Sequence, residues 1–174
     1  SDRRILILHD SDLQRTTDGT GTVENMTTKE LKNVRTRKSD QPLSYLEDVL
    51  DFLKDKEDVF LQIEIKCEKY SEAALADMCQ IMTDMIRNRI DLSKIVFICF
   101  EKRALQEIKK LNPSQQTCLV AKEINTEVIA NALSAGAEQV SVNTNNVYRN
   151  FIKEAHKAGL KVTTWTVLND DDAR

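Results

Sequence analysis

The chain alternates between short, continuously apolar runs and longer amphipathic segments. The apolar runs predict five strands, over residues 59–65, 95–100, 117–121, 139–142 and 160–167. Continuously apolar strands are typical of parallel sheets whose faces are covered by helices. The pattern therefore predicts one α/β domain built from strand–helix units. It fits both an open twisted sheet and a closed (β/α)₈ barrel, and in both folds catalytic groups gather at the carboxyl ends of the strands.

Amphipathic segments between and before these strands predict the helices. The longer ones cover residues 71–89, 102–111, 126–135 and 147–158. Two shorter helices are indicated by Thr27–Glu30 and Ser44–Glu47, because both have the Ser/Thr-x-x-Glu spacing in which side chains bind the first free amides of a helix. Asp170 or Asp171 is placed to begin one more helix, and Arg4–Leu8 is predicted to be extended.

The composition is typical of a soluble globular domain and excludes disordered and fibrous chains. The sequence has 174 residues, of which 41% are apolar and 30% are charged, so there is enough apolar surface for a core. The apolar runs are far shorter than the ~20 residues that cross a bilayer. With 25 Lys and Arg against 28 Asp and Glu, the formal net charge is −3. This balance argues against binding of nucleic acid by bulk charge.

The four cysteines do not have the spacing of a zinc site. Cys67, Cys79, Cys99 and Cys118 contain no Cys-x-x-Cys pair, whereas zinc sites usually take two ligands from one tight turn. We therefore expect free thiols that serve as small hydrophobic side chains. Free thiols fit a reducing compartment, and we predict a cytoplasmic location.

Polar residues interrupt the apolar pattern near the carboxyl ends of the predicted strands. Gln62, Glu64 and Lys66 alternate with apolar residues, so their side chains share one face of the sheet. In a barrel that face is the interior, where a carboxylate and an ammonium group are costly unless they have a function. A solvated edge strand would explain the same alternation. The other residues at strand ends are Phe100, Glu101, Lys122, Asn143, Trp165 and Thr166.

His9 and Trp165 are further candidates for a functional site. His9 follows the extended segment and precedes Asp10, where an imidazole can act as a general acid or base. A hydrogen-bonded structural histidine would give the same pattern. The other histidine, His156, lies among charged residues of a predicted helix and is expected at the surface. Trp165, the one tryptophan, fits either the core or a contact with an apolar part of a ligand.

Three sequence blocks carry a resemblance to a known family. Residues 7–23 contain His9-Asp10 followed by Leu-x-Arg-Thr-Thr-x-Gly-x-Gly-x-Val. Residues 63–66 read Ile-Glu-Ile-Lys, and residues 155–167 lead from Ala-His-Lys-Ala-Gly to Trp-Thr-Val. In their order, and over almost the whole chain, these blocks resemble the glycerophosphodiester phosphodiesterase family, a branch of the phospholipase-C-like phosphodiesterases.

The resemblance implies a TIM (β/α)₈ barrel that hydrolyses glycerophosphodiesters to glycerol 3-phosphate and an alcohol, assisted by Mg²⁺ or Ca²⁺. His9 matches one of two histidines that act as acid and base, and Lys66 matches the lysine near the phosphate, so both are candidate catalytic residues. Glu64 matches a carboxylate ligand of the metal ion. Trp165 matches the aromatic residue at the mouth of the substrate site. The implied partner is a small-molecule glycerophosphodiester, and the oligomeric state is left open.

Several blocks of the family pattern are not found in this sequence. They are the His-Arg-Gly block with the other histidine, the Glu-x-Asp pair of the metal site and a late Gly-Val-Asp-Gly-Ile strand. Residues 1–174 are therefore expected to form a single domain of this family, truncated at both ends. A (β/α)₈ barrel takes ~250 residues, so the chain would cover roughly the middle two-thirds, without the first two strands and the last one. We expect hydrolysis by the full-length protein and not by this chain alone.

Alternative functions are compatible with the same residues. A non-catalytic member of the same fold would bind a phosphodiester or a protein partner. A phosphodiesterase of this fold would also suit lysophospholipid or sphingolipid head groups. An open-sheet α/β binding protein outside the family is a third possibility.

Overall fold

The computed structural model describes residues 4–125 and 127–168. The chain divides into two compact units, residues 1–57 and residues 58–174, and each is described by itself. The helix predicted to begin at Asp170 or Asp171 lies outside the described residues. That residues 1–174 form a single domain truncated at both ends stays a prediction.

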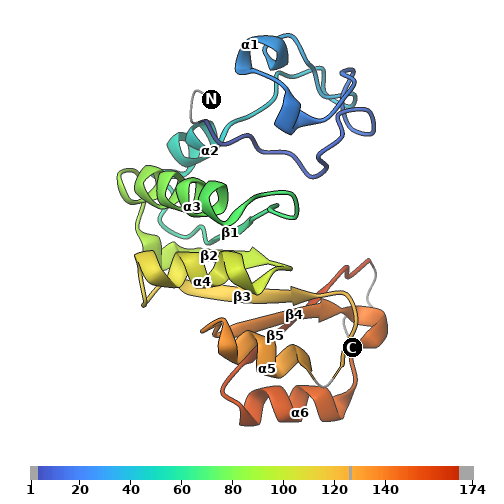
Figure 1. Ribbon diagram of the computed structural model, residues 1–174, viewed down its shortest axis with the longest axis vertical. Coiled ribbons are helices and arrows are strands. Elements are labelled where there is room, and N and C mark those ends of the chain that lie inside the picture. Colours follow the sequence, from blue (N-terminus) through green and yellow to red (C-terminus); the bar gives the residue numbers. More distant parts are fainter. Residues whose placement is uncertain (1–3, 126, 169–174) are drawn as a thin grey trace. The chain divides into compact units, whose positions relative to one another are not determined.

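The second unit is built on a sheet of five parallel strands (Figure 1). They are β1 (Leu61–Glu64), β2 (Ile95–Cys99), β3 (Gln116–Ala121), β4 (Gln139–Asn143) and β5 (Lys161–Trp165). All the strands predicted from the apolar runs are confirmed. Their order in the sheet is β1-β2-β3-β4-β5, so each strand is added on the same side of the one before. A doubly wound sheet reverses this order at its switch point, whereas a barrel does not. The order therefore supports the predicted barrel fold, of which these strands form an open part.

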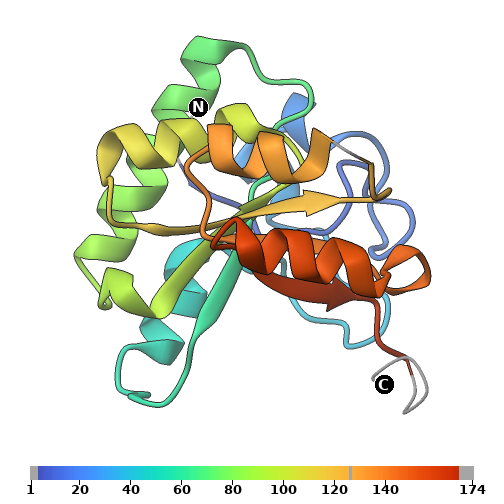
Figure 2. The ribbon, with the colours of Figure 1, turned by 90° about the horizontal axis from the view of Figure 1, so that it is seen from below.

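In the described part of the second unit, a helix follows each of β1 to β4; the last three of these helices contact the sheet, and the first packs against the second (Figure 2). They are α3 (Glu72–Arg87), α4 (Lys102–Leu111), α5 (Glu127–Ser134) and α6 (Arg149–Lys157), with short 3₁₀ turns η2 (Leu92–Lys94) and η3 (Thr144–Asn146). The helix predicted over residues 71–89 is confirmed; of the apolar residues on its predicted inner face, Leu75, Cys79, Met82 and Ile86 are buried, and Met78 and Met85 are half-buried. Within the described residues, no helix is long and apolar enough to cross a membrane.

The two faces of the sheet differ in polarity at β1 and β2. Ile63 of β1 pairs with Phe97 of β2, and both side chains are buried. Glu64 belongs to the opposite face, and the alternation of buried and half-buried side chains continues past the strand to Lys66. The prediction that Gln62, Glu64 and Lys66 share one face is confirmed. It is the face that a barrel turns inward.

The first unit has little regular structure and a small core of its own. It contains η1 (Val23–Asn25), α1 (Thr28–Leu31) and α2 (Leu46–Leu53). Its buried cluster consists of Leu13, Leu31, Val34 and Leu43. The segment predicted to be extended at residues 4–8 forms no described strand; Leu6 makes a single antiparallel bridge to Tyr45. The amide of Ile7 donates to the carbonyl of Ser44 at 2.9 Å, so this segment pairs with residues just before α2.

The two helix starts predicted in the first unit have different outcomes. Thr27 caps α1 as expected, because its Oγ1 accepts the amide of Glu30 at 3.3 Å and the Glu30 carboxylate accepts the amide of Thr27 at 2.7 Å. The start predicted at Ser44 is wrong by one residue. Tyr45 precedes α2, and its amide donates to the carboxylate of Asp48 at 2.9 Å. In both helices the amide of the residue before the first turn is bound by a carboxylate three residues further along the chain. The position of that carboxylate therefore sets where each helix begins.

All four cysteines are buried free thiols, as predicted. Burial raises the pKa of Cys79 and of Cys118 to about 12, so both are protonated at neutral pH. The Sγ atoms of Cys67 and Cys99 lie 3.7 Å apart behind the ends of β1 and β2. The cytoplasmic location stays a prediction.

Candidate functional site

Side chains from four strand ends meet in the second unit. Glu64 ends β1 and Lys66 follows it, Phe100 follows β2, Lys122 follows β3 and Trp165 ends β5. We call these five residues the strand-end cluster. The sequence predicted that polar and aromatic residues at the carboxyl ends of the strands lie together, and for these five the contacts below confirm it. Their catalytic, metal-binding and substrate-binding roles stay predictions.

Glu64 and Lys66 form an ion pair. Lys66 Nζ donates to Glu64 Oε1 at 2.5 Å, and the Lys66 and Glu64 side chains are 36% and 28% exposed. β1 is at the edge of the described sheet. A solvated edge strand would expose both side chains fully, and neither of them is fully exposed. The pairing offsets the cost of placing two charges on this face. An anionic or cationic ligand would compete for one partner and free the other.

Phe100 lies at the centre of the strand-end cluster. Its ring meets that of Trp165 edge to face, with centroids 6.0 Å apart and an interplanar angle of 84°. Lys66 Nζ and Lys122 Nζ lie 5.8 Å and 5.6 Å from the centroid of the Phe100 ring, within the range of cation–π attraction. The cluster therefore offers ammonium groups for an anion beside an aromatic wall for an apolar group. Phe100 and Lys122 had been selected from the sequence as strand-end residues, without a role.

Trp165 presents a hydrogen-bond donor as well as an aromatic ring. Its Nε1 is shielded from solvent and has no hydrogen-bond acceptor among the described residues. The side chain as a whole is half-buried, so Trp165 is not simply part of the core. Because a shielded N–H without a partner is unfavourable, a ligand oxygen that reached this nitrogen would be bound favourably.

The thiol of Cys99 supports the cluster from the buried face of the sheet. Its Sγ donates to the carbonyl oxygen of Ile65 at 3.1 Å and accepts the amide of Glu101 at 3.3 Å. The residue between Glu64 and Lys66 is thereby tied to the end of β2. The main chain between Glu64 and Lys66 is therefore bound by a side chain on the opposite, buried face of the sheet.

His9 belongs to the first unit, where it contacts Asp10 and Arg15. His9 Nδ1 lies 2.6 Å from Asp10 Oδ1, and Arg15 Nε donates to Asp10 Oδ2. Arg15 Nη2 lies farther from Nδ1, at 3.3 Å. Because an ionised carboxylate only accepts, the proton of the first pair belongs to Nδ1. The other ring nitrogen, Nε2, is then the one that can exchange a proton with a ligand, and the His9 side chain is 71% exposed.

Asp10 keeps its negative charge in this arrangement. Hydrogen bonds from Arg15 and then from His9 lower the pKa of the Asp10 carboxyl from 3.8 to about 2. The stabilisation that this charge gives the folded state is present above pH 3.8 and is lost as the pH falls through about 2. At neutral pH Asp10 is therefore a fixed anion beside His9. No role is predicted for Asp10 or Arg15 from the sequence, although the His-Asp-x₄-Arg spacing is a signal that points to both residues.

The described residues supply only part of a site for a divalent cation. Mg²⁺ and Ca²⁺ take about six or more oxygen ligands. Glu64 is the carboxylate of the strand-end cluster, but no group of three or more His, Cys, Asp or Glu side chains in residues 4–125 and 127–168 could hold a metal ion. Glu64 fits as one ligand, and the described residues do not complete the shell.

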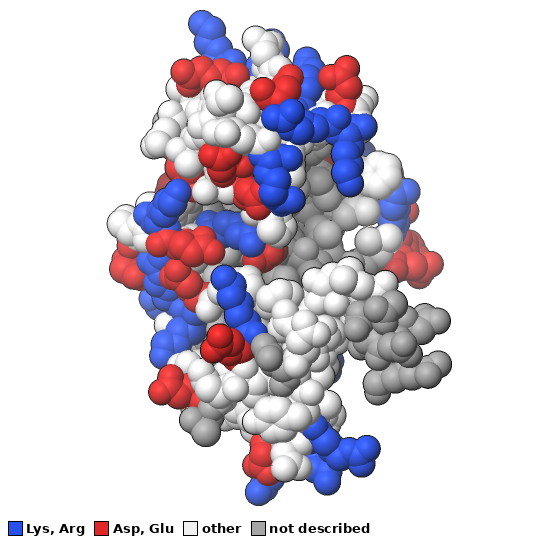
Figure 3. Space-filling model, turned by 90° about the vertical axis from the view of Figure 1, so that its right-hand side faces the viewer, with Lys and Arg blue, Asp and Glu red and all other residues white. Residues whose placement is uncertain are grey.

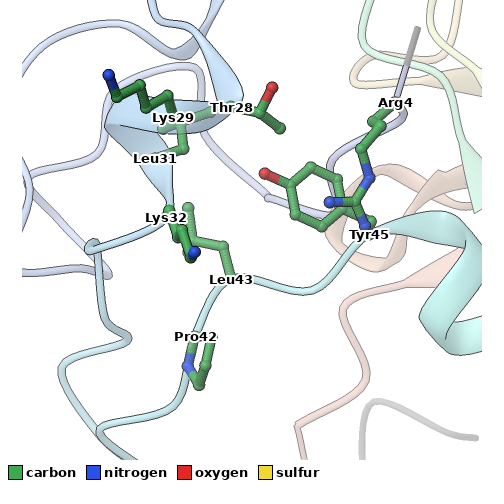
Figure 4. A pocket seen from close by; sticks show the side chains of 8 residues that line it. All are labelled: Arg4, Thr28, Lys29, Leu31, Lys32, Pro42, Leu43 and Tyr45. Atoms are coloured by element: carbon green, nitrogen blue, oxygen red, sulfur yellow. The ribbon is translucent and has the colours of Figure 1, made fainter. Parts of the chain in front are cut away.

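A pocket of about 450 Å³ lies in the first unit (Figure 4). It is lined by Arg4, Thr28, Lys29, Leu31, Lys32, Pro42, Leu43 and Tyr45. The Arg4 guanidinium lies 3.6 Å from the centroid of the Tyr45 ring, and its Nε donates to Glu47 at 2.5 Å, so its charge is already compensated. None of the site residues predicted from the sequence lines this pocket.

Charges of both signs are mixed over the face shown in Figure 3. Lys and Arg side chains alternate there with Asp and Glu side chains rather than forming a field of one sign. The mixture agrees with the nearly balanced composition of the chain. On this face, recognition of an anion would therefore depend on individual groups rather than on a broad field of one sign.

Comparison with known proteins places the sequence in a family. The sequence model of the glycerophosphoryl diester phosphodiesterase family matches residues 1–174. The protein YhdW of Bacillus subtilis (strain 168), named as a glycerophosphodiester phosphodiesterase, is 26% identical over 181 residues. The match covers 99% of this chain and 72% of YhdW.

Solved structures share the fold at lower identity. A glycerophosphoryl diester phosphodiesterase homologue from Silicibacter pomeroyi has a TM-score of 0.86 at 21% identity, over 98% of this chain and 71% of that one. The phosphodiesterase OLEI02445 of Oleispira antarctica, solved with the product sn-glycerol-3-phosphate, has a TM-score of 0.85 at 20% identity, over 99% of this chain and 71% of that one. These likenesses show the fold, and the match of the family model to the whole sequence shows more: the chain belongs to the glycerophosphoryl diester phosphodiesterase family.

Proposed function

We propose that the full-length protein hydrolyses glycerophosphodiesters to glycerol 3-phosphate and an alcohol. Membership of a phosphodiesterase family supports this reaction. The observation in this chain that supports the proposal is the Glu64–Lys66 ion pair, which lies beside Phe100 and Trp165 on the inward face of the sheet. A small anionic ester with an alcohol portion matches both the charged and the aromatic parts of this cluster. A relative of the same fold was solved with sn-glycerol-3-phosphate.

Lys66 is proposed to bind the phosphoryl group. A phosphodiester is an anion and repels nucleophiles, so a cation at its non-bridging oxygens favours the more highly charged transition state. The Lys66 ammonium is held at one position by Glu64 and lies near the Phe100 ring. A substrate phosphate would take over the hydrogen bond that Lys66 now gives to Glu64.

Glu64 is proposed as one ligand of a divalent cation, Mg²⁺ or Ca²⁺. Such an ion supplies positive charge that stabilises phosphoryl oxygens. The ion pair with Lys66 keeps the Glu64 carboxylate on the inward face. With Lys66 bound to the substrate phosphate, the Glu64 carboxylate would be able to hold such a cation.

His9 is proposed to transfer a proton at Nε2. Asp10 accepts the proton of Nδ1 and, as a fixed anion, stabilises the ring when it carries both protons. We assign His9 to protonation of the leaving alcohol oxygen as the phosphorus–oxygen bond breaks. Trp165 and Phe100 are proposed to contact the carbon skeleton of the substrate, with the Trp165 N–H donating to one of its oxygens.

Replacement of Asp10 by asparagine is expected to lower kcat by about tenfold and to leave KM nearly unchanged. The asparagine oxygen still accepts the Nδ1 proton of His9 but no longer carries the charge that stabilises the doubly protonated ring. The measurement is the steady-state release of glycerol 3-phosphate from glycerophosphocholine. Asp12→Asn is the matched control, because Asp12 accepts the amide of Gln14 and does not contact the His9 ring. Equal rates for the Asp10→Asn variant and the wild-type protein would contradict this role of Asp10.

The substrate class is tested with soluble and micellar esters. The full-length protein is incubated with glycerophosphocholine and, separately, with lysophosphatidylcholine above its micelle-forming concentration. The proposal predicts faster release of alcohol from the soluble diester. Preference for the micellar substrate would support a lysophospholipid phosphodiesterase, and binding of glycerophosphocholine without turnover would support a non-catalytic member of the fold.

A further inference from the structure

Arg103 fastens the loop that follows β1. It lies in the first turn of α4, and its side chain is 25% exposed. Arg103 Nη2 donates to the carbonyl oxygen of Cys67 at 2.7 Å, and Nη1 donates to the carbonyl oxygen of Tyr70 at 2.8 Å. One guanidinium thus binds both ends of a short turn, which the amide of Tyr70 also closes by donating to the carbonyl oxygen of Cys67 at 2.9 Å.

Two carboxylates hold the guanidinium in place. Arg103 Nε donates to Glu101 Oε2 at 2.5 Å, and Nη1 lies 3.0 Å from Glu72 Oε1. These hydrogen bonds, that from Glu101 first, raise the pKa of Arg103 above its ordinary value. The side chain is therefore a permanent cation with its orientation fixed by residues at the starts of α3 and α4.

The fastened loop carries Lys66. Ile65, on one side of Lys66, is held by the amide hydrogen bond to the carbonyl of Ile98 at 2.9 Å. Cys67, on the other side, is held by Arg103. The main chain on both sides of Lys66 is thus fixed, which sets where its ammonium group lies relative to Glu64 and Phe100.

We propose that Arg103 is a positioning residue that acts through Lys66. The proposal rests on the function assigned to Lys66 above. A planar guanidinium suits this task because it can donate to two carbonyl oxygens and a carboxylate at once with fixed angles, whereas an ammonium group would hold only one of them firmly. Arg103 itself contacts main chain and carboxylates rather than substrate.

The same helix provides a matched control at the other end of the strands. Lys109 of α4 donates to the carbonyl oxygen of Gln115 at 2.6 Å and pairs with Glu138. Like Arg103, Lys109 is a cation that binds a main-chain carbonyl, but this carbonyl belongs to the loop that precedes β3. Loss of Lys109 should lower stability without displacing Lys66.

The test compares Arg103→Met, Arg103→Lys and Lys109→Met in the full-length protein, each with and without Lys66→Met. A displacement of about 1 Å at a substrate-positioning group costs on the order of a hundredfold in rate. We therefore expect Arg103→Met to lower kcat/KM for glycerophosphocholine by ten- to a hundredfold, Arg103→Lys to restore part of it, and Lys109→Met to lower the Tm with kcat/KM unchanged. In the Lys66→Met background, Arg103→Met should add almost no further loss, because the group it positions is gone.

Two kinetic results would overturn the proposal. One is wild-type kcat/KM in folded Arg103→Met, and the other is the same fold-loss from Arg103→Met with and without Lys66. Amide hydrogen exchange of residues 65–71 gives a readout that does not need activity. If the wild-type protein released no glycerol 3-phosphate, the proposed function would fail. Faster exchange in Arg103→Met, but not in Lys109→Met, would still support positioning of Lys66, and unchanged exchange would reject it.

Discussion

Replacement of His9 by alanine is expected to lower the turnover number of the full-length protein on glycerophosphocholine by roughly 10²–10⁴-fold. Alanine removes the ring nitrogen that gives a proton to the leaving alcohol oxygen. Because His9 is 71% exposed and its polar contacts are with Asp10 and Arg15, its loss should leave the fold intact. The measurement is kcat at saturating substrate, with circular dichroism to verify folding.

His156→Ala is the matched control for this experiment. His156 is exposed on α6, where the sequence predicted a surface residue, and its replacement should leave kcat unchanged. Rapid turnover of an ester with a more acidic leaving alcohol by His9→Ala would support the assignment as an acid, because such an alcohol leaves without protonation. Hydrolysis of glycerophosphocholine by His9→Ala at the wild-type rate would contradict it.

Replacement of Glu64 by glutamine is expected to lower kcat/KM by on the order of 10²–10³-fold, as loss of one preorganised electrostatic group does elsewhere. Glutamine has the same shape but no charge, so it binds a divalent cation weakly and no longer forms an ion pair with Lys66. Two measurements test this: activity as a function of added Mg²⁺ or Ca²⁺, and direct titration of the metal into the protein. A chelator should abolish wild-type activity, and added cation should restore it.

Glu154→Gln serves as the control for Glu64→Gln, because Glu154 is an exposed carboxylate on α6. It should have wild-type activity and wild-type metal affinity. If Glu64→Gln bound the cation as well as the wild-type protein and lost activity all the same, Glu64 would act through Lys66 rather than through a metal ion. Unaltered activity would exclude both roles.

The sheet could be predicted from the sequence because its physical signal is local. Five mostly apolar runs separated by amphipathic segments leave few arrangements other than parallel strands covered by helices. The face shared by Glu64 and Lys66 was predictable for the same reason, since side chains alternate along a strand. What the pattern could not decide was open sheet against barrel, because that depends on the order of strands in space.

Contacts between distant residues could not be predicted in this way. Arg103 binds carbonyl groups 33 and 36 residues away, and a main-chain carbonyl has no signature in the sequence. The position of Phe100 at the centre of the strand-end cluster likewise could not be predicted, because it depends on the Trp165 ring, whose centroid lies 6.0 Å from that of Phe100. The start of α2 was missed by one residue because Asp48, rather than Glu47, binds the free amide, and both carboxylates fit the general rule.

The most direct test of the proposed reaction is to follow glycerophosphocholine with the full-length protein by ³¹P nuclear magnetic resonance. We expect the phosphodiester signal to be replaced by the phosphomonoester signal of glycerol 3-phosphate, with free choline released, and we expect Lys66→Met and His9→Ala to slow this conversion. Formation of phosphocholine and glycerol instead, or a phosphodiester signal that persists with the folded wild-type protein and added Mg²⁺ or Ca²⁺, would contradict the proposed reaction.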